Sequence, residues 1–413
     1  MSDLDQRVRA IFDAGVAAAD PAQAVAQAMD WAREDMPGPS GRWQVIALGK
    51  AALAMAGAAL ADLPGGTGAL IVTNPENADG AALPEGARLI VGDHPVPGAG
   101  SEAAGRAILQ TLAELGPQDR VLALISGGGS ALAVAPVDGV SLSDKAEVSR
   151  LLLGCGADIT QMNLIRQQLS QLKGGGWLAA SAPPVTGLIL SDVPGDDLAV
   201  IASGPTVSPI GTRAQARDLC RDLGIFDALP APVRAHLTQA DAPRDLPAAR
   251  NRLIGANAIS VAAMLQAGAQ EAPFALSGDV ADLAPRIVAL LADLALGQVL
   301  AFGGETTVTL RGDGLGGRNQ ELALRVALLA EQAGVSGAWR FLSGGTDGRD
   351  GPCDAAGGVV GPRTCQAIRE AGENPDALLA NNDSYRALKA GQALLVTGAT
   401  GTNVADLAVL ARG

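Results

Sequence analysis

The sequence is poor in aromatic residues and histidine, and each shortage excludes a class of structure or site. Aromatic residues make up 2% of the 413 residues, so we expect cores of aliphatic side chains, as where helices lie closely on a parallel sheet. His94 and His236 are the two histidines, neither has an evident serine or cysteine partner, and no G-x-S-x-G motif occurs. These absences argue against a triad hydrolase.

Cysteine is also scarce, and its spacing is uninformative for metal binding. The four cysteines are Cys155, Cys220, Cys353 and Cys365, and none forms a CxxC pair. We expect unpaired thiols that act as small core residues, and no zinc site.

The chain has no excess of basic residues and no long apolar run. No uninterrupted apolar run approaches the roughly 20 residues of a membrane span, and the first ten residues, MSDLDQRVRA, are charged. The formal net charge of −13 argues against a nucleic-acid or anionic-membrane partner. We therefore expect a soluble, cytoplasmic protein that binds small molecules. The sequence leaves the oligomeric state open, a homodimer included.

The length predicts two domains, because 413 residues exceed one ordinary core. Helices are expected over residues 4–19 and after Asp20-Pro21, and short β-rich runs then alternate with helical stretches. This alternation predicts a doubly wound, parallel, Rossmann-like α/β sheet. The polar segment 238–250 holds two prolines and predicts a boundary between an N-terminal α/β domain (1–240) and a C-terminal α/β domain (250–413).

Glycine is abundant, and it gathers in loops that follow predicted strands. These loops read ISGGGSAL (125–132), SDVPGDD (191–197), GGETT (303–307) and GGTDG (344–348). Backbone amides of such turns converge and suit phosphates or carboxylates. We expect the three glycines of the first loop and the serines on either side of them to cradle a phosphate; these residues are Ser126, Gly127, Gly128, Gly129 and Ser130. A tight crossover turn is the structural alternative.

Lys50 and Asp192 each follow a predicted strand directly. Gly49-Lys50 is not part of a Walker loop, because Gln44 and Ala51 stand where the loop needs glycine and a hydroxyl residue. A lysine at a strand's carboxyl end still lies where open α/β sheets bind ligands. Asp192 could hold Mg²⁺ or orient a nucleophile. A solvated lysine and a helix cap are the respective alternatives.

Arg318 follows the segment GDGLGG (312–317). Its letters fit the G-x-G-x-x-G pattern of dinucleotide-binding loops, but its sequence context does not. The acidic residue expected about 20 positions further on, at the end of the next strand, is missing, since Glu331 falls inside a predicted helix over 319–333. Arg318 at that helix start could fork onto a carboxylate or phosphate, or form a surface salt bridge.

Three more polar residues lie in glycine- or asparagine-rich turns. Glu305 and Asp347 are framed by glycines and could ligate a metal or cap a turn. Asn382, in the run NND, could contact a ligand or could stabilise a turn.

Taken in order from about Gly49 to Asp406, these motifs resemble the class II glycerate kinases, whose C-terminal half is the MOFRL domain. The resemblance implies two three-layer α/β/α domains with the active site in the cleft between them. It implies transfer of the γ-phosphoryl group of ATP to D-glycerate, giving 2-phosphoglycerate, with Mg²⁺.

The resemblance also implies residue roles. Lys50 and Arg318 correspond to the family's proposed key residues, Asp192 acts as a catalytic group or metal ligand, and Asp347 as a metal ligand. We assign residues 126–130, Glu305 and Asn382 to nucleotide binding.

Two other functions stay open. Some relatives carry a hydroxypyruvate reductase label, which would require NAD(P)H. A non-catalytic protein that binds a small acid is the other alternative, because Gln167, Gln168 and Ala399 depart from the family pattern.

Overall fold

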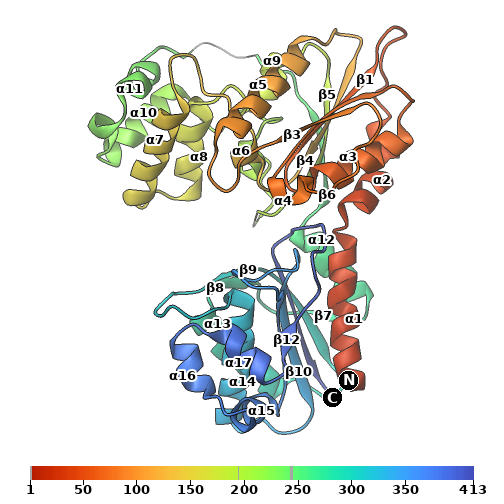
Figure 1. Cartoon of the computed structure of the whole chain (residues 1–413), viewed down its shortest axis with the longest axis vertical. Coiled ribbons are helices and arrows are strands. Elements are labelled where there is room, and N and C mark those ends of the chain that lie inside the picture. The colour runs from red at the N-terminus through yellow and green to blue at the C-terminus, as the bar shows by residue number, and fades with distance from the viewer. Residues whose placement is uncertain (1, 194, 242–244) are drawn as a thin grey trace. The chain divides into compact units, whose positions relative to one another are not determined.

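Figure 1 shows a computed structural model that describes residues 2–193, 195–241 and 245–413. Pro194, within the predicted SDVPGDD loop, and residues 242–244, within the predicted boundary, lie outside the described residues. The chain folds into two compact units. One comprises residues 21–254, and the other combines residues 1–20 with residues 255–413.

The unit of residues 21–254 is built on a six-stranded sheet with the order β3-β2-β1-β4-β5-β6. The pairs β3–β2, β2–β1, β1–β4 and β4–β5 are parallel. This is the strand order of the Rossmann fold, so the predicted parallel, doubly wound sheet is confirmed. The strands are β1 (Trp43–Leu48), β2 (Gly68–Thr73), β3 (Ala87–Val91), β4 (Arg120–Ile125), β5 (Val185–Leu190) and β6 (Arg250–Gly255).

Helices cover both faces of this sheet because its strands are apolar on both sides. Ile46 and Leu48 belong to the core that includes α5 and α9, whereas Val45 and Ala47, also buried, point to the opposite face, where α3 packs. The helices are α2 (Pro21–Ala32), α3 (Ala52–Asp62), α4 (Pro75–Ala78), α5 (Ala99–Ala113), α6 (Gly129–Leu132) and α9 (Gly176–Ala180).

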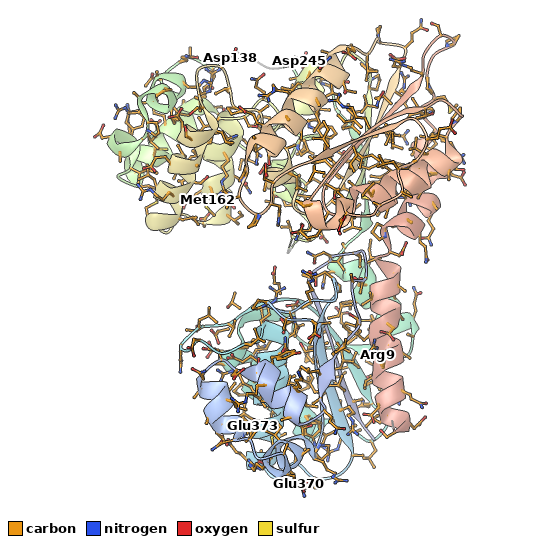
Figure 2. The ribbon with its side chains drawn as sticks, in the orientation of Figure 1. Arg9, Asp138, Met162, Asp245, Glu370 and Glu373 are labelled. Atoms are coloured by element: carbon orange, nitrogen blue, oxygen red, sulfur yellow. The ribbon has the colours of Figure 1, made fainter. Side chains whose placement is uncertain are left out.

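Four further helices form a group of their own beside the sheet (Figure 1). They are α7 (Leu142–Gly154), α8 (Ile159–Gln168), α10 (Arg213–Asp222) and α11 (Ala231–Leu237). We call them the helical group. Val148, Ile165 and Cys220 lie in its separate apolar core, and Met162 on α8 packs against that core (Figure 2). Helix α8 ends at Gln168, and Leu172, a few residues further on, packs in the core of the six-stranded sheet.

The other unit holds a seven-stranded mixed sheet in which β12, β11, β10, β13, β9 and β7 lie in that order and β8 pairs with β9. The pairs from β12 to β9 are antiparallel, and β7 and β8 run parallel to β9. The strands are β7 (Gln270–Glu271), β8 (Leu276–Asp279), β9 (Val299–Thr307), β10 (Trp339–Gly345), β11 (Gly357–Val360), β12 (Leu394–Leu395) and β13 (Asp406–Arg412).

Two helical layers sandwich this sheet, as the predicted three-layer architecture requires. One face packs on α1 (Asp3–Ala18) and α12 (Asn257–Gln266). The other face packs mainly on α13 and α14 with the shorter helices after them. These helices are α13 (Val280–Asp293), α14 (Arg318–Gln332), α15 (Thr364–Glu370), α16 (Pro375–Ala380) and α17 (Ser384–Ala390).

The unit limits differ from the expected ranges at two places. Helix α1 lies on the sheet of residues 255–413, because its apolar face, with Val8, Ile11 and Phe12, covers that sheet. Strand β6 extends the first sheet beside β5, so the sheet of the first unit continues beyond residue 250. Among the described residues, no helix is long and apolar enough to cross a membrane.

Candidate active site

Lys50 lies at the point where the strand order of the first sheet reverses. Strands β1 and β4 are neighbours, with Leu48 opposite Ile125, while the connections from β1 and β4 lead away in opposite directions. The carboxyl ends of two such strands leave a crevice in which open α/β sheets bind ligands. Lys50 follows β1 here, and residues 126–130 follow β4.

The two loops are held together by hydrogen bonds between their backbones and side chains. The Lys50 amide donates to the Gly127 carbonyl at 2.9 Å, and the Ala51 amide donates to Ser126 Oγ at 3.1 Å. Gly49 has a φ of +130°, and a Cβ there would collide with Ser126. Lys50 is therefore placed by a rigid contact between loops that are distant in sequence.

Asp192 lies directly against this glycine loop. A Cβ at Gly127 would collide with Asp192 Oδ2, and a Cβ at Gly128 would come within 3.3 Å of Lys50 Cγ. Burial raises the pKa of Asp192, while a backbone hydrogen bond and the charge of Lys50 act in the opposite direction. The structure thus brings Lys50, the glycine loop and Asp192 together, and their shared role in one site stays a prediction.

His94 is a neighbour that the sequence analysis did not select. A Cβ at Gly128 would lie 3.4 Å from His94 Nε2. Burial, and then the nearby Lys50 charge, lower the pKa of the imidazole and so favour its neutral form. His94 lies three residues after the end of β3, much as Lys50 and Asp192 each lie two residues after the end of their strands.

Ser130 belongs to a buried polar network that the sequence analysis also missed. Lys173 Nζ donates to the Ser130 carbonyl at 3.2 Å, to Ser130 Oγ at 3.0 Å and to Ser203 Oγ at 3.3 Å. The two serine hydroxyls are 2.7 Å apart, and Ser203 Oγ donates to Asn163 Oδ1 at 3.2 Å. These residues are separated by up to 73 positions, so spacing gave no sign of the network.

Arg318 lies in the other unit, at the first turn of α14, and is held by two carboxylates. Its guanidinium forms a fork with Asp406, with Nε–Oδ2 at 2.6 Å and Nη2–Oδ1 at 3.0 Å, and Nη1 lies 3.0 Å from Glu305 Oε1. Burial opposes its charge, but the hydrogen bond and the charges of Asp406 and Glu305 hold the pKa of Arg318 above its usual range. Asp406, at the start of β13, was not among the expected site residues.

Asp350 binds the start of the same helix. Its carboxylate accepts from the Asn319 amide at 3.1 Å and from the Gln320 amide at 2.7 Å, so it satisfies two backbone donors of the first turn. Burial raises the pKa of Asp350 to about 6, against the effect of those two amides.

Asn382 and Asp347 use their polar atoms within the chain. Asn382 Oδ1 accepts from the Arg311 and Gly312 amides at 2.6 and 3.0 Å, and its Nδ2 donates to Glu321 at 2.9 Å. Asp347 Oδ1 accepts from the Arg349 amide at 2.9 Å, as in a tight turn. Their ligand roles stay predictions.

The described residues fit Mg²⁺ through single carboxylates completed by substrate phosphates. Among the described residues there is no group of three His, Cys, Asp or Glu side chains that could hold a metal ion. Mg²⁺ in kinases is commonly bound by one or two carboxylates plus substrate phosphates. Asp192, beside the proposed phosphate loop, can supply such a carboxylate.

The glycines of the GDGLGG string pack tightly against the chain itself. Cβ atoms at Gly312 and Gly314 would collide with Asn381, and at Gly316 with Ser384. These glycines are therefore needed for packing within the unit, which supports our interpretation that the string is not a dinucleotide fingerprint.

The fold and these groups define a class: a two-unit α/β protein whose Rossmann-order sheet presents a lysine, a carboxylate and a glycine loop suited to an anionic small molecule. The domain of unknown function DUF4147 matches residues 7–238, and the MOFRL family matches residues 298–406.

Proteins of this kind are known from several organisms. The D-glycerate 2-kinase of Thermotoga maritima is 40% identical over 76% of this chain and 78% of its own length. An Agrobacterium vitis protein with a provisional hydroxypyruvate reductase label is 40% identical over 99% of this chain and 94% of its own. The crystal structure of the Thermotoga maritima glycerate kinase aligns with a TM-score of 0.90 and 34% identity over 99% of both chains. The chain therefore belongs to the MOFRL family of glycerate kinases, and the predicted resemblance is confirmed.

Proposed function

We propose that the protein is an ATP-dependent glycerate 2-kinase. In the reaction, the 2-hydroxyl oxygen of D-glycerate forms a bond to the γ-phosphorus of ATP, the β–γ bridging bond breaks, and ADP leaves. The observation that carries the proposal is the contact of Lys50 and Asp192 with the loop of residues 126–130 at the strand-order reversal. The names of the Thermotoga maritima relatives support glycerate as the acceptor.

The proposed roles follow from charge and position. The amides of residues 126–130 and the Lys50 ammonium stabilise the phosphate charge that moves during transfer. Asp192 would hold Mg²⁺ together with phosphate oxygens, and the ion would neutralise phosphate charge. Asp347 stays a second proposed ligand from the family resemblance.

The hydroxyl proton needs an acceptor within the same site. The raised pKa of Asp192 makes its carboxylate a better proton acceptor, whereas the lowered pKa of His94 makes its imidazole a weaker base. We propose the Asp192 carboxylate as the acceptor of the hydroxyl proton. The test is the pH profile of kcat/KM: Asp192→Asn should abolish its acidic limb and His94→Gln should leave that limb in place.

We propose that Arg318 binds the glycerate carboxylate. Its side chain is 33% exposed although Asp406 and Glu305 hold it, and a guanidinium matches a carboxylate in two parallel hydrogen bonds. Lys50 and Arg318 lie in different units, and their action in one reaction stays a prediction.

The activity test measures ADP release from Mg²⁺-ATP with and without D-glycerate. We expect glycerate-dependent release, and we expect Lys50→Ala to lower kcat by about 10²–10³-fold, the usual cost of one preorganised charge contact. Lys389→Ala is the matched control, because Lys389 is exposed on α17. Near-normal turnover by folded Lys50→Ala protein would refute the role of Lys50.

The alternative function is an NAD(P)H-dependent hydroxypyruvate reductase. It is supported by the name of the Agrobacterium vitis relative. The packing of Gly312 and Gly314 against Asn381 argues against nicotinamide binding there. Hydroxypyruvate-dependent NADH oxidation without ADP release would favour the reductase. Ligand-induced stabilisation without either turnover would favour a non-catalytic binding protein.

We also propose a cytoplasmic protein whose partners are small molecules. The acidic balance of the chain supports this proposal, because a basic face for nucleic acid is not to be expected at a formal net charge of −13. We also expect a homodimer, which size-exclusion chromatography with light scattering would test.

A further inference from the structure

Three positive side chains gather where the helical group meets the loop after β4. Lys145 lies on α7, Arg166 lies on α8, and Lys173 follows α8. Lys173 reaches Ser130 of the proposed phosphate loop. The cluster is thus attached to the candidate active site through a direct hydrogen bond.

Several donors in this cluster have no acceptor. Lys145 Nζ and Asn163 Nδ2 are buried without a hydrogen-bond partner, and Asn163 is only 2% exposed. In the described part of the chain, Arg166 has neither a hydrogen bond nor an ion pair. Buried donors of this kind are rare and point to a missing acceptor.

The charges of the cluster are not balanced by the protein. Burial, and then the charge of Arg166, lower the pKa of Lys145 to about 8. Burial, with the charges of Lys145 and Arg166, lowers the pKa of Lys173 well below its usual range. None of the described carboxylates is paired with these three side chains. Unpaired buried cations cost folding free energy, and a bound anion would remove that cost.

The backbone beside the cluster is strained in a way that positions one hydroxyl. Ala202 and Ser203 have φ values of +49° and +60°, which non-glycine residues rarely adopt. This conformation holds Ser203 Oγ between Ser130 Oγ and Asn163 Oδ1. The hydroxyl thereby joins the loop after β4 to α8.

We propose that Lys145, Arg166 and the Asn163 amide nitrogen form a subsite for a phosphate group, beside the paired hydroxyls of Ser130 and Ser203. Phosphate fits better than a single carboxylate, because a dianion balances more of the cluster's charge and has enough acceptors for several separate donors. The inference rests on the proposed kinase function in its choice of ligand. The phosphate belongs either to the nucleotide or to the phosphorylated product.

The test compares wild type with Lys145→Met, which keeps the stem and removes the charge. Thermal shift and calorimetry are run with inorganic phosphate, ADP, 2-phosphoglycerate and D-glycerate as separate probes. We expect Lys145→Met without ligand to melt at a higher temperature than wild type. It should bind phosphate-bearing probes about 10- to 100-fold more weakly, as the loss of a charged hydrogen bond implies. Its affinity for D-glycerate should not change. Lys389→Met is the matched control and should behave as wild type.

The outcomes separate the subsite from the kinase. Selective loss for ADP assigns the subsite to the nucleotide, and selective loss for 2-phosphoglycerate assigns it to the product. Unchanged affinity for all phosphate probes, or a lower melting temperature with no selective loss, overturns the subsite. If glycerate is not phosphorylated but ADP binding still depends on Lys145, the proposed function fails and the subsite stands.

Discussion

At the scale of single residues, the pair Arg318–Asp406 connects a proposed catalytic side chain to the stability of its unit. Asp406 is 0% exposed and takes a forked hydrogen bond from Arg318. Removing one partner of such a pair leaves a buried charge without compensation.

Arg318→Ala should therefore lower the free energy of unfolding by about 3–5 kcal/mol in addition to its effect on activity. The double variant Arg318→Ala/Asp406→Asn should recover a large part of that loss but not the activity. Denaturant unfolding and ADP release on the same samples test both statements. A single variant as stable as wild type would contradict this account of the pair.

Because of Lys145, we expect the free energy of unfolding to rise as the pH becomes alkaline. Its folded pKa of about 8 lies below the ordinary 10.5, so between these values the unfolded chain binds more protons and the free energy of unfolding increases with pH. We expect a gain of about 1–2 kcal/mol from pH 7.5 to 10, less than the full pKa difference implies because the stem is partly exposed. Lys145→Met should show a flatter pH dependence in denaturant titrations, and an equal slope in both proteins would contradict it.

The sequence made some of these residues predictable and not others. Lys50 was identifiable because lysine is rare and this one follows a strand. Asp192 was identifiable for the same positional reason. Lys173, Ser203 and Asp406 were not, since their partners lie far away in sequence and only the fold brings them together.

At the scale of elements, the loop between β4 and α6 has the strongest geometric requirements. Gly128 has a φ of +83°, and a Cβ there would meet Lys50 and His94. Gly66 has the same φ of +83° with open space around it, so the two glycines differ in surroundings and not in backbone strain.

Gly128→Ala and Gly66→Ala should thus each lose about 1–2 kcal/mol of stability, the cost of a left-handed conformation for a residue with a Cβ. Only Gly128→Ala should also lower kcat/KM, by roughly tenfold or more, because it displaces Lys50. Steady-state kinetics on both variants provide the test. Equal activity of the two variants would show that the loop does not set the position of Lys50.

Most elements could be predicted from sequence, and the exceptions have physical reasons. Helices such as α1 and α14 show apolar residues at helical spacing and fell close to their expected ranges. Strand β13 is central in its sheet, and the sequence does not reveal this, since a short apolar run near residue 410 does not show which strands it will pair with. The mixture of parallel and antiparallel strands in that sheet could not be predicted from the sequence either, because strand direction depends on which strands pair.

At the scale of the whole molecule, α1 shows that sequence order and unit membership differ. Helix α1 comes first in the chain, yet its apolar face completes the core of the unit formed by residues 255–413. Its periodicity predicted a helix but contained no information on which sheet it would cover.

Phe12→Ala should accordingly destabilise that unit by about 3–5 kcal/mol, because Phe12 is fully buried. Hydrogen exchange should show lost protection in β9 and β13, with β1 and β4 unaffected. Leu310→Ala, at a residue 75% exposed in the same unit, is the control and should change neither. Loss of protection first in β1 would mean that α1 supports the other sheet.

The central claim is that the molecule transfers phosphate to the 2-hydroxyl of glycerate. The most direct measurement is phosphorus NMR of the product formed from Mg²⁺-ATP and D-glycerate by wild type, with Lys50→Ala as the comparison. Our account predicts the 2-phosphoglycerate signal from wild type and a strongly reduced one from Lys50→Ala. A 3-phosphoglycerate signal, or no phosphorylated product together with NADH oxidation by hydroxypyruvate, would contradict it.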